Sequence, residues 1–311
     1  MSIDLGFDDG QQAVFDSLSQ FCADRCSEEV VKSLAGGFPD SLWRELAELG
    51  VLALATAEGD GGALEAVAAC EALGRAVFPG PIASTFLATQ VLPAADRALV
   101  AEGGTVVAVG SPPLWPWAPV AGIFIEVADG RAWRCTPRGE VVAVETLGGE
   151  PWGRVRVERE ADLGPVDPAL SLYELTLAAY LAAAGTQLVE ITADHVRTRK
   201  QFGKALGEFQ AVAHPLADCS MALAAATGLA RAAGFHFDAQ AECTRVAAAA
   251  ARLSACRAAV EAAQVCHQLF GALGITLEGP VFHISRRIRQ LASQPPDDAS
   301  ARAEVIGGFG L

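Results

Sequence analysis

The sequence predicts a mainly α-helical protein with a small β region in its middle. Short runs rich in valine and isoleucine, separated by proline and glycine, are confined to residues 104–164. The flanking segments are instead rich in alanine and leucine at helical spacing. At 311 residues the chain is long enough to bury a large core without disulfides. We therefore expect an N-terminal helical domain over residues 1–103, a β domain over 104–165 and a C-terminal helical bundle over 166–311.

The N-terminal region has the pattern of helices separated by glycine turns. Asp40 and Ser41 can cap a helix that follows them, and Gly50 can end that helix in a left-handed conformation. A further helix is expected after the glycine turn at 59–62, where apolar residues recur over 64–74.

The β region contains four candidate strands, and the helical pattern resumes directly after it. Asp167 followed by Pro168 predicts a helix start, with a capping side chain and a proline at the first helical position. Alanine lets helices approach closely, so a tight four-helix bundle is the simplest arrangement of the remaining chain. The candidate strands are 105–110, 121–128, 140–147 and 153–158, and the candidate bundle helices are 168–200, 209–238, 241–270 and 280–292.

Charge and composition exclude several classes of function. The 23 basic and 37 acidic residues give a net charge of −14, which disfavours nucleic acid and anionic membranes as partners. The N-terminus lacks the pattern of a signal peptide, and the longest charge-free helical stretch, between Glu174 and Glu190, is too short to span a membrane. The eight scattered cysteines indicate buried thiols in a reducing cytoplasm, and the five histidines show no metal-ligand spacing. We expect a cytoplasmic protein with no membrane span and no metal.

Three phrases near helix ends are candidates for chemistry. The basic residues of RKQFG, 199–203, can interact with the helix dipole, or a guanidinium there can grip a phosphate. The glycines of QLFGALG, 268–274, can be ordinary helix caps or can let a ligand approach the backbone. The cluster of Arg286, Arg287 and Arg289 is expected to be a solvated or ion-paired surface, with contact to an anionic cofactor or partner as the alternative.

Taken together, these phrases resemble the acyl-CoA dehydrogenase family over nearly the full chain. TRKQFGKALGEFQAVAHPLADCSMAL and QLFGALGITLEGPVFHISRRIR resemble its two C-terminal signatures, and LWRELAELGVLALATAEGDGGALEAVAACEALGRA resembles its first helical domain. The resemblance implies helices, a β-barrel-like middle domain and a four-helix bundle. It also implies FAD as cofactor and an acyl-CoA thioester as substrate, with a carboxylate taking the α proton and the flavin taking the β hydride.

The resemblance implies roles for particular residues. Side chains of the two signatures reach the adenosine and pyrophosphate part of an FAD bound mainly to a neighbouring subunit, and the glycines of the second signature line the adjacent turn. Ala272 stands where a glycine is usual, which keeps backbone contact plausible. The implied FAD-contacting residues here are Arg199, Gln201, Phe202, Gln268, Gly271 and Ala272.

The sequence departs from the family where the flavin ring and the thioester would bind. The middle region is too short and lacks the family's ring-side phrases, so we expect a truncated β domain. Pro295 occupies the usual position of the catalytic glutamate, and proline cannot accept a proton. Some members place the base on the long helix before the first signature, and Glu174 lies within one residue of that position. Glu174 is therefore a candidate base, although a solvated first-turn glutamate is the favoured interpretation.

These departures predict an incomplete subunit. It resembles the shortened subunit of the heteromeric α2β2 actinobacterial dehydrogenases that act on steroid side-chain acyl-CoA thioesters. The expected partner is a full-length homologue that supplies the base and the ring site and passes electrons to an acceptor. Two alternatives remain: a flavin-free scaffold or binding subunit, and a non-redox acyl-CoA lyase or hydratase on the same fold.

Overall fold

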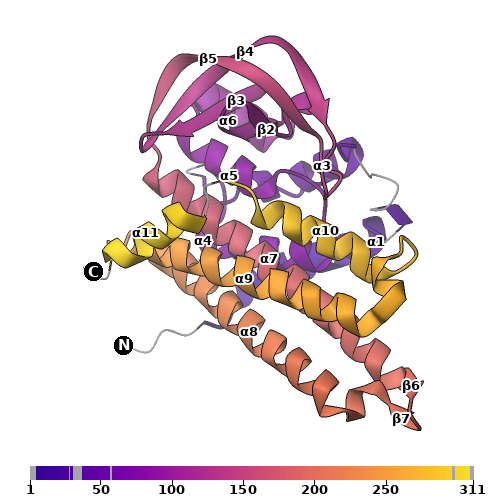
Figure 1. Cartoon of the computed structure of the whole chain (residues 1–311). Coiled ribbons are helices and arrows are strands. Elements are labelled where there is room, and N and C mark those ends of the chain that lie inside the picture. Colours follow the sequence, from indigo (N-terminus) through magenta and orange to yellow (C-terminus); the bar gives the residue numbers. More distant parts are fainter. Residues whose placement is uncertain (1–4, 28, 31–36, 57, 296–297, 309–311) are drawn as a thin grey trace.

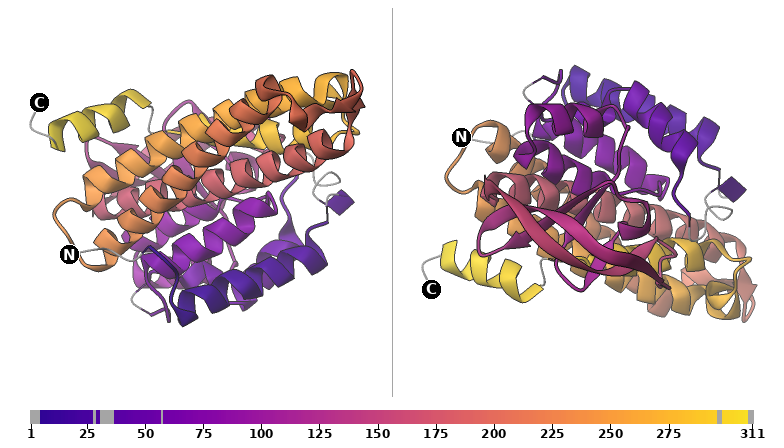
Figure 2. Two further views of the ribbon diagram at one scale, coloured as in Figure 1. Left: turned by 90° about the horizontal axis from the view of Figure 1, so that it is seen from below. Right: turned by 90° about the horizontal axis from the view of Figure 1, so that it is seen from above.

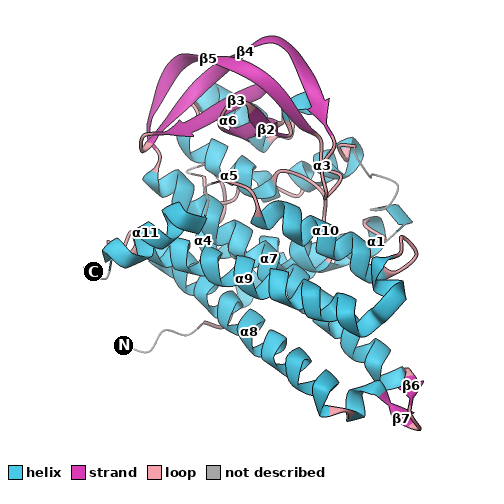
Figure 3. Ribbon diagram, viewed as in Figure 1, coloured by secondary structure: helices cyan, strands magenta, loops and turns pink. Residues whose placement is uncertain are grey.

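The computed structural model describes residues 5–27, 29–30, 37–56, 58–295 and 298–308. Within this part of the chain, helices come first, a sheet follows, and long helices close the order (Figure 1). Figure 3 shows that strands are confined to the sheet and to one short hairpin at the far end of the bundle. The predicted fold class is confirmed.

The N-terminal helices cover the first long helix of the bundle, α7 (Asp167–Thr198). Gly74 shows how closely they pack, because a Cβ at this position would lie 2.3 Å from the carbonyl oxygen of Tyr180 on α7. Only a glycine lets the two helix backbones meet here. These helices are α1 (Asp9–Arg25), α3 (Asp40–Glu48), α4 (Ala63–Arg75), α5 (Ile82–Val91) and α6 (Ala94–Ala101).

Two predicted side-chain caps are absent. Pro39 is the N-cap of α3, so Asp40 lies in the first turn, where its carboxylate favours the helix dipole without capping a backbone N–H. Val166 is the N-cap of α7, and the Asp167 side chain makes no cap bond. The two predictions about backbone conformation are confirmed. Gly50 adopts a left-handed φ of 77° after α3, and a proline lies in the first turn of α7.

The sheet is built around one long hairpin. Strands β4 and β5 pair antiparallel from Arg131 opposite Pro165 to Val144 opposite Trp152. This pairing holds residues 131–139 in a strand, although their composition did not predict one. The strands are β1 (Val107–Gly110), β2 (Leu114–Pro116), β3 (Ile123–Ala128), β4 (Arg131–Val144) and β5 (Trp152–Pro165), in the order β1-β3-β4-β5-β2.

The C-terminal helices form the predicted bundle, and α7, α8 and α9 lie side by side in Figure 2. Gly185 on α7 permits this packing, because a Cβ there would lie 2.6 Å from the Leu223 side chain and 3.3 Å from the Ala259 Cα. The helices after α7 are α8 (Gln210–Asp238), α9 (Thr244–Phe270), α10 (Pro280–Ala292) and α11 (Asp298–Gly308). The four predicted bundle helices are therefore confirmed.

Helix α7 is the centre of the core. It contacts α4, α5, α8, α9 and α10, and one hydrophobic cluster extends from the N-terminal helices through the bundle. Among the described helices, α7 alone is long and apolar enough to cross a membrane, but 78% of its most apolar window is buried inside the fold. Its apolar composition is thus explained by packing against its neighbours.

Candidate functional site

The two predicted signature phrases meet at one end of the bundle. In an up-and-down bundle the first and third helices run in the same direction, so α7 and α9 both end there. The His195 ring on α7 stacks on the Phe270 ring on α9, with centroids 4.1 Å apart and an interplanar angle of 15°. RKQFG follows α7 directly, and QLFG contains the last turn of α9. The predicted contact residues are therefore neighbours in space, and we call this region the helix-end surface.

RKQFG continues α7 into a short hairpin. Lys200 and Gln201 form β6 (Lys200–Gln201), which pairs with β7 (Lys204–Ala205). The two turn residues, Phe202 and Gly203, have φ values of 53° and 85°. This turn suits asparagine and glycine, whereas a phenylalanine in the left-handed region is strained. The Phe202 side chain is also 90% exposed, so a large apolar ring stands at an unfavourable backbone position and in water.

QLFGALG ends α9 in an open turn. Gly271 has φ 60°, and a Cβ there would meet no other atom within 4 Å, so its backbone is open to solvent. Gln268, Gly271 and Ala272 are exposed. The following residues Leu273, Ile275 and Leu277 are exposed as well, with Ile275 at 72%. The helix-end surface therefore presents both polar groups and apolar side chains to solvent.

Arg199 is one of the cations of the helix-end surface, next to the exposed Lys200. It is exposed, and its side chain makes no hydrogen bond or ion pair with another described residue. Its backbone N–H donates to the His195 carbonyl at 2.9 Å, which fixes it to the last turn of α7. Burial and, secondly, the Arg199 charge lower the pKa of His195. The ring is therefore neutral at pH 7, and Arg199 is available to an anion.

Glu174 does not have the solvated position that we favoured for it. It is fully buried on α7, where its carboxylate forms an ion pair with Arg245 and lies 3.7 Å from Nη1 of Arg252. That prediction was wrong because α9 brings both arginines against the start of α7, a contact the local sequence does not reveal. The carboxylate is engaged in an internal ion pair, and its role as a base stays a prediction.

Pro295 lines a small cavity between the sheet and the bundle. This cavity has a volume of about 80 Å³ and is also lined by Ser111, Leu170 and Tyr173. The usual base position of the family therefore borders this cavity, but Pro295 is exposed and its side chain has no atom that accepts a proton. No described acidic residue lines this cavity.

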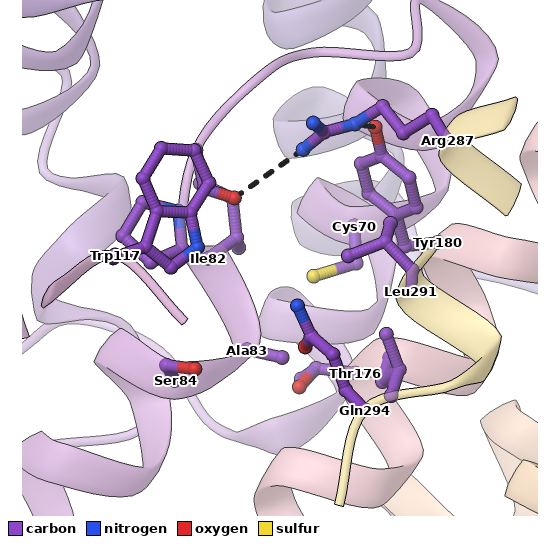
Figure 4. Close-up of a pocket in the computed structure, with 13 residues that line it drawn as sticks. Cys70, Ile82, Ala83, Ser84, Trp117, Thr176, Tyr180, Arg287, Leu291 and Gln294 are labelled. Atoms are coloured by element: carbon purple, nitrogen blue, oxygen red, sulfur yellow. Dashed lines mark hydrogen bonds between the residues drawn. The ribbon is translucent and has the colours of Figure 1, made fainter. Parts of the chain in front are cut away.

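A second cavity lies deeper between α5, α7 and α10 (Figure 4). Its volume is about 20 Å³, which suffices for a water molecule but is far below the roughly 300 Å³ of a small-molecule site. Trp117, Tyr180 and Arg287 fill the surrounding space. This cavity has no room for an acyl group.

Arg287 belongs to a buried polar network, which corrects the prediction of a surface arginine cluster. It is 5% exposed, its Nη1 lies 2.6 Å from Oε1 of Glu150, and its Nε donates to the Tyr180 hydroxyl at 2.8 Å. Burial opposes its charge, but Tyr180 and Glu150 outweigh burial and raise the pKa of Arg287. Arg289 is exposed as expected. Sequence reasoning missed Glu150 and Tyr180, because both lie more than a hundred residues from Arg287.

The groups of the helix-end surface match the chemistry of the adenosine and pyrophosphate part of FAD. The unpaired Arg199 guanidinium can bind a phosphate, the amides of Gln201 and Gln268 can donate and accept hydrogen bonds, and the exposed Phe202 ring can pack on an aromatic base. The observed donors and the open backbone at Gly271 therefore fit the cofactor that the resemblance implies.

Comparison with known proteins identifies the family. The family description "Acyl-CoA dehydrogenase, N-terminal domain" matches residues 8–102, and "Acyl-CoA dehydrogenase, C-terminal domain" matches residues 169–293. The sheet lies between the two matches. The chain is 32% identical to acyl-CoA dehydrogenase IpdE2 of Mycobacterium tuberculosis over 257 residues, which is 78% of each chain.

Two solved structures show the same fold. The ChsE4-ChsE5 complex from Mycobacterium tuberculosis matches with a TM-score of 0.85 and 22% identity, covering 99% of both chains. The Tcur3481-Tcur3483 steroid ACAD, in its G363A variant, matches with a TM-score of 0.84 and 21% identity, again over 99% of both chains. With two family descriptions matched along its length and a relative that is 32% identical over 78% of the chain, this chain belongs to the acyl-CoA dehydrogenase family.

Proposed function

We propose that this chain is the shortened subunit of a heteromeric, FAD-dependent acyl-CoA dehydrogenase. Its helix-end surface would contact the adenosine and pyrophosphate side of an FAD that a full-length homologue holds. When bound, FAD accepts the hydride removed from the acyl-CoA. The observation that carries this proposal is the meeting of both signature phrases at one end of the bundle, with their polar groups exposed and unpaired.

The charge balance at the helix-end surface supports this role for Arg199. Helices α7 and α9 both end there, so two helix carboxyl ends direct negative partial charge toward any bound phosphate. The chain as a whole is also acidic, with a net charge of −14. A phosphate here would therefore need a local cation, and Arg199, which directly follows α7, is exposed and unpaired beside the exposed Lys200.

The interior of the chain supports the assignment of the base and the acyl site to a partner. Pro295 cannot take a proton, Glu174 is held by two arginines, and the inner cavity has a volume of about 20 Å³. The exposed apolar residues Phe202 and Ile275 beside the polar groups are the kind of surface that a partner covers.

The two solved structures support a heteromer. One is named as a ChsE4-ChsE5 complex and the other as a steroid ACAD with two named components. We extend the two-component assembly and the steroid substrate to this chain. It would form a heterotetramer with a full-length partner and act on a steroid side-chain acyl-CoA, and electrons would leave through the partner. The eight unpaired cysteines accord with a reducing cytoplasm as its location.

Co-expression with a full-length homologue tests this proposal. We expect the chain alone to be colourless and the co-purified complex to carry flavin absorbance and acyl-CoA dehydrogenase activity. In the complex, Arg199→Ala should weaken FAD retention by about tenfold or more, since a charge-assisted contact to phosphate is lost. The matched control is Arg156→Ala, because Arg156 is an exposed arginine on β5, far from the helix-end surface.

The outcomes separate the three functions considered. A complex that retains FAD equally with and without Arg199 would support a flavin-free scaffold role for this chain. Product formation without an electron acceptor would support a lyase or hydratase. A yellow, active complex made of this chain alone would overturn the need for a partner.

A further inference from the structure

We propose that the His195–Phe270 ring pair is the positioning element of the helix-end surface. It would hold the Arg199 segment and the Gln268 segment at the spacing that one FAD requires. This inference rests on the proposed function and assigns a role to two residues that touch no ligand themselves.

The ring pair joins the two helices close to both predicted contact segments. His195 lies one helical turn before Arg199, and the Arg199 N–H donates to the His195 carbonyl at 2.9 Å. Phe270 is the last residue of α9 and immediately precedes Gly271. A shift of either ring therefore moves the backbone that presents a predicted FAD contact.

The ring pair extends the contact between α7 and α9 beyond the tightly packed core. Along α7, Gly185 packs against α9, and the Leu188 carbonyl accepts a hydrogen bond from the Cys266 thiol at 3.7 Å. His195 lies about two turns further on. Thr192 and Val196 are also buried on this part of α7, but the rings join the two helices directly beside both predicted contact segments.

The geometry of the ring pair suits positioning. The rings stack nearly parallel, at 15°, with centroids 4.1 Å apart, and both side chains are only partly buried. Such a contact constrains the distance and the angle between two helix ends but contributes little buried apolar area. A residue needed only for packing would instead resemble Val196, the next residue on α7, which is 3% exposed in the core.

The test uses the co-expressed complex and measures FAD dissociation by flavin fluorescence, at a temperature where every variant is folded. His195→Leu keeps an apolar side chain but removes the ring, whereas His195→Phe keeps a ring that can stack. We expect His195→Leu to weaken FAD retention by about three- to tenfold, because an aromatic pair is lost, and His195→Phe to restore it. Val196→Ala is the matched control: it should lower thermal stability and leave FAD retention unchanged.

The possible results distinguish this inference from the proposed function. If Arg199→Ala weakens FAD retention but His195→Leu does not, the positioning role is wrong and the flavin contact stands. If His195→Phe fails to restore retention, or if Val196→Ala weakens it as much as His195→Leu, the ring pair acts only through stability. If none of these variants affects FAD, the proposed function itself is wrong.

Discussion

Phe202 combines a strained backbone with an exposed apolar side chain, and both lower the stability of the isolated chain. Its backbone is left-handed at φ 53°, and its ring is 90% exposed. Strained residues cluster at functional sites, where the strain is retained for a contact. Phe202→Asn places the residue that this turn favours before Gly203, so we expect the free energy of unfolding to rise by up to about 1 kcal/mol in urea melts. FAD retention in the complex should fall.

Gln240 provides the control for Phe202, because it also has a left-handed backbone, at φ 51°, after α8. Gln240→Asn should give a similar gain in stability and no change in FAD retention. A Phe202→Asn complex that binds FAD normally would show that the ring has no part in the contact.

His195 should make stability depend on pH. Burial and Arg199 lower its pKa in the folded state, so the folded chain binds this proton less readily than the unfolded chain. Stability is then full above the unfolded-state value of about 6.5 and falls as the pH drops below it. His195→Phe should remove part of the loss seen in urea melts between pH 7.5 and pH 5.5. The pKa of His267 is also lowered by burial, so a smaller loss of the same sign should remain.

Residue types and spacing placed the two signature phrases at helix ends but did not reveal the buried charges. RKQFG follows the end of α7 and QLFG includes the last turn of α9, so exposed residues could be anticipated in both. The Glu174–Arg245 and Glu150–Arg287 pairs join residues far apart in the chain, and only the fold brings them together. A charged residue in an otherwise apolar helix, as Glu174 is in α7, was the available signal that a buried partner exists.

At the scale of elements, α4 begins on a side chain from another helix. The Asp238 carboxylate, at the end of α8, accepts hydrogen bonds from the N–H groups of Ala63 and Leu64 at 2.7 and 3.1 Å. Gly62 makes room for it, since a Cβ there would lie 2.6 Å from Oδ1 of Asp238. This cap ties the N-terminal helices to the bundle, and the sequence around Gly62 gave no sign of it.

We expect Asp238→Ala to lower the free energy of unfolding by about 1–2 kcal/mol, because two N–H groups at the start of α4 lose their acceptor. Burial raises the pKa of the Asp238 carboxyl, because it disfavours the charged form. We therefore expect the hydrogen bonds that its oxygen atoms accept to contribute more to stability than its negative charge. Asp238→Asn should therefore cost less than Asp238→Ala in the same urea melts. Equal losses for the two variants would show that the charge dominates.

Element boundaries were predictable where local chemistry sets them and not where pairing does. Gly50 permits a left-handed backbone where α3 ends, and Pro168 fixes its own φ where α7 begins. The first half of β4 was missed, because its charged and polar residues become a strand only by pairing with β5. The three-residue β2, which contains proline, is held in the same way by β5.

At the scale of the whole molecule, the Glu150–Arg287 pair links the sheet to the bundle. Glu150 lies in the turn between β4 and β5, and Arg287 lies on α10. Arg287 Nη2 also donates to the Phe78 carbonyl at 3.1 Å, so one side chain reaches all three parts of the chain. This link adds a polar anchor to the apolar packing of the sheet, since Val107, Ile123 and Ile125 belong to the same hydrophobic cluster as the helices.

Removing Arg287 should therefore destabilise the whole chain. Arg287→Met keeps most of the side-chain volume but leaves Glu150 buried without its cation, and we expect a loss of about 3–5 kcal/mol in the free energy of unfolding. Burial already raises the pKa of Glu150, and Arg287 offsets part of that rise. The double variant Glu150→Gln with Arg287→Met removes both charges, so it should recover a large part of the loss. Urea melts of the wild type, both single variants and the double variant give the coupling energy. Additive losses would mean that the two residues stabilise the chain independently and that the sheet is anchored by other contacts.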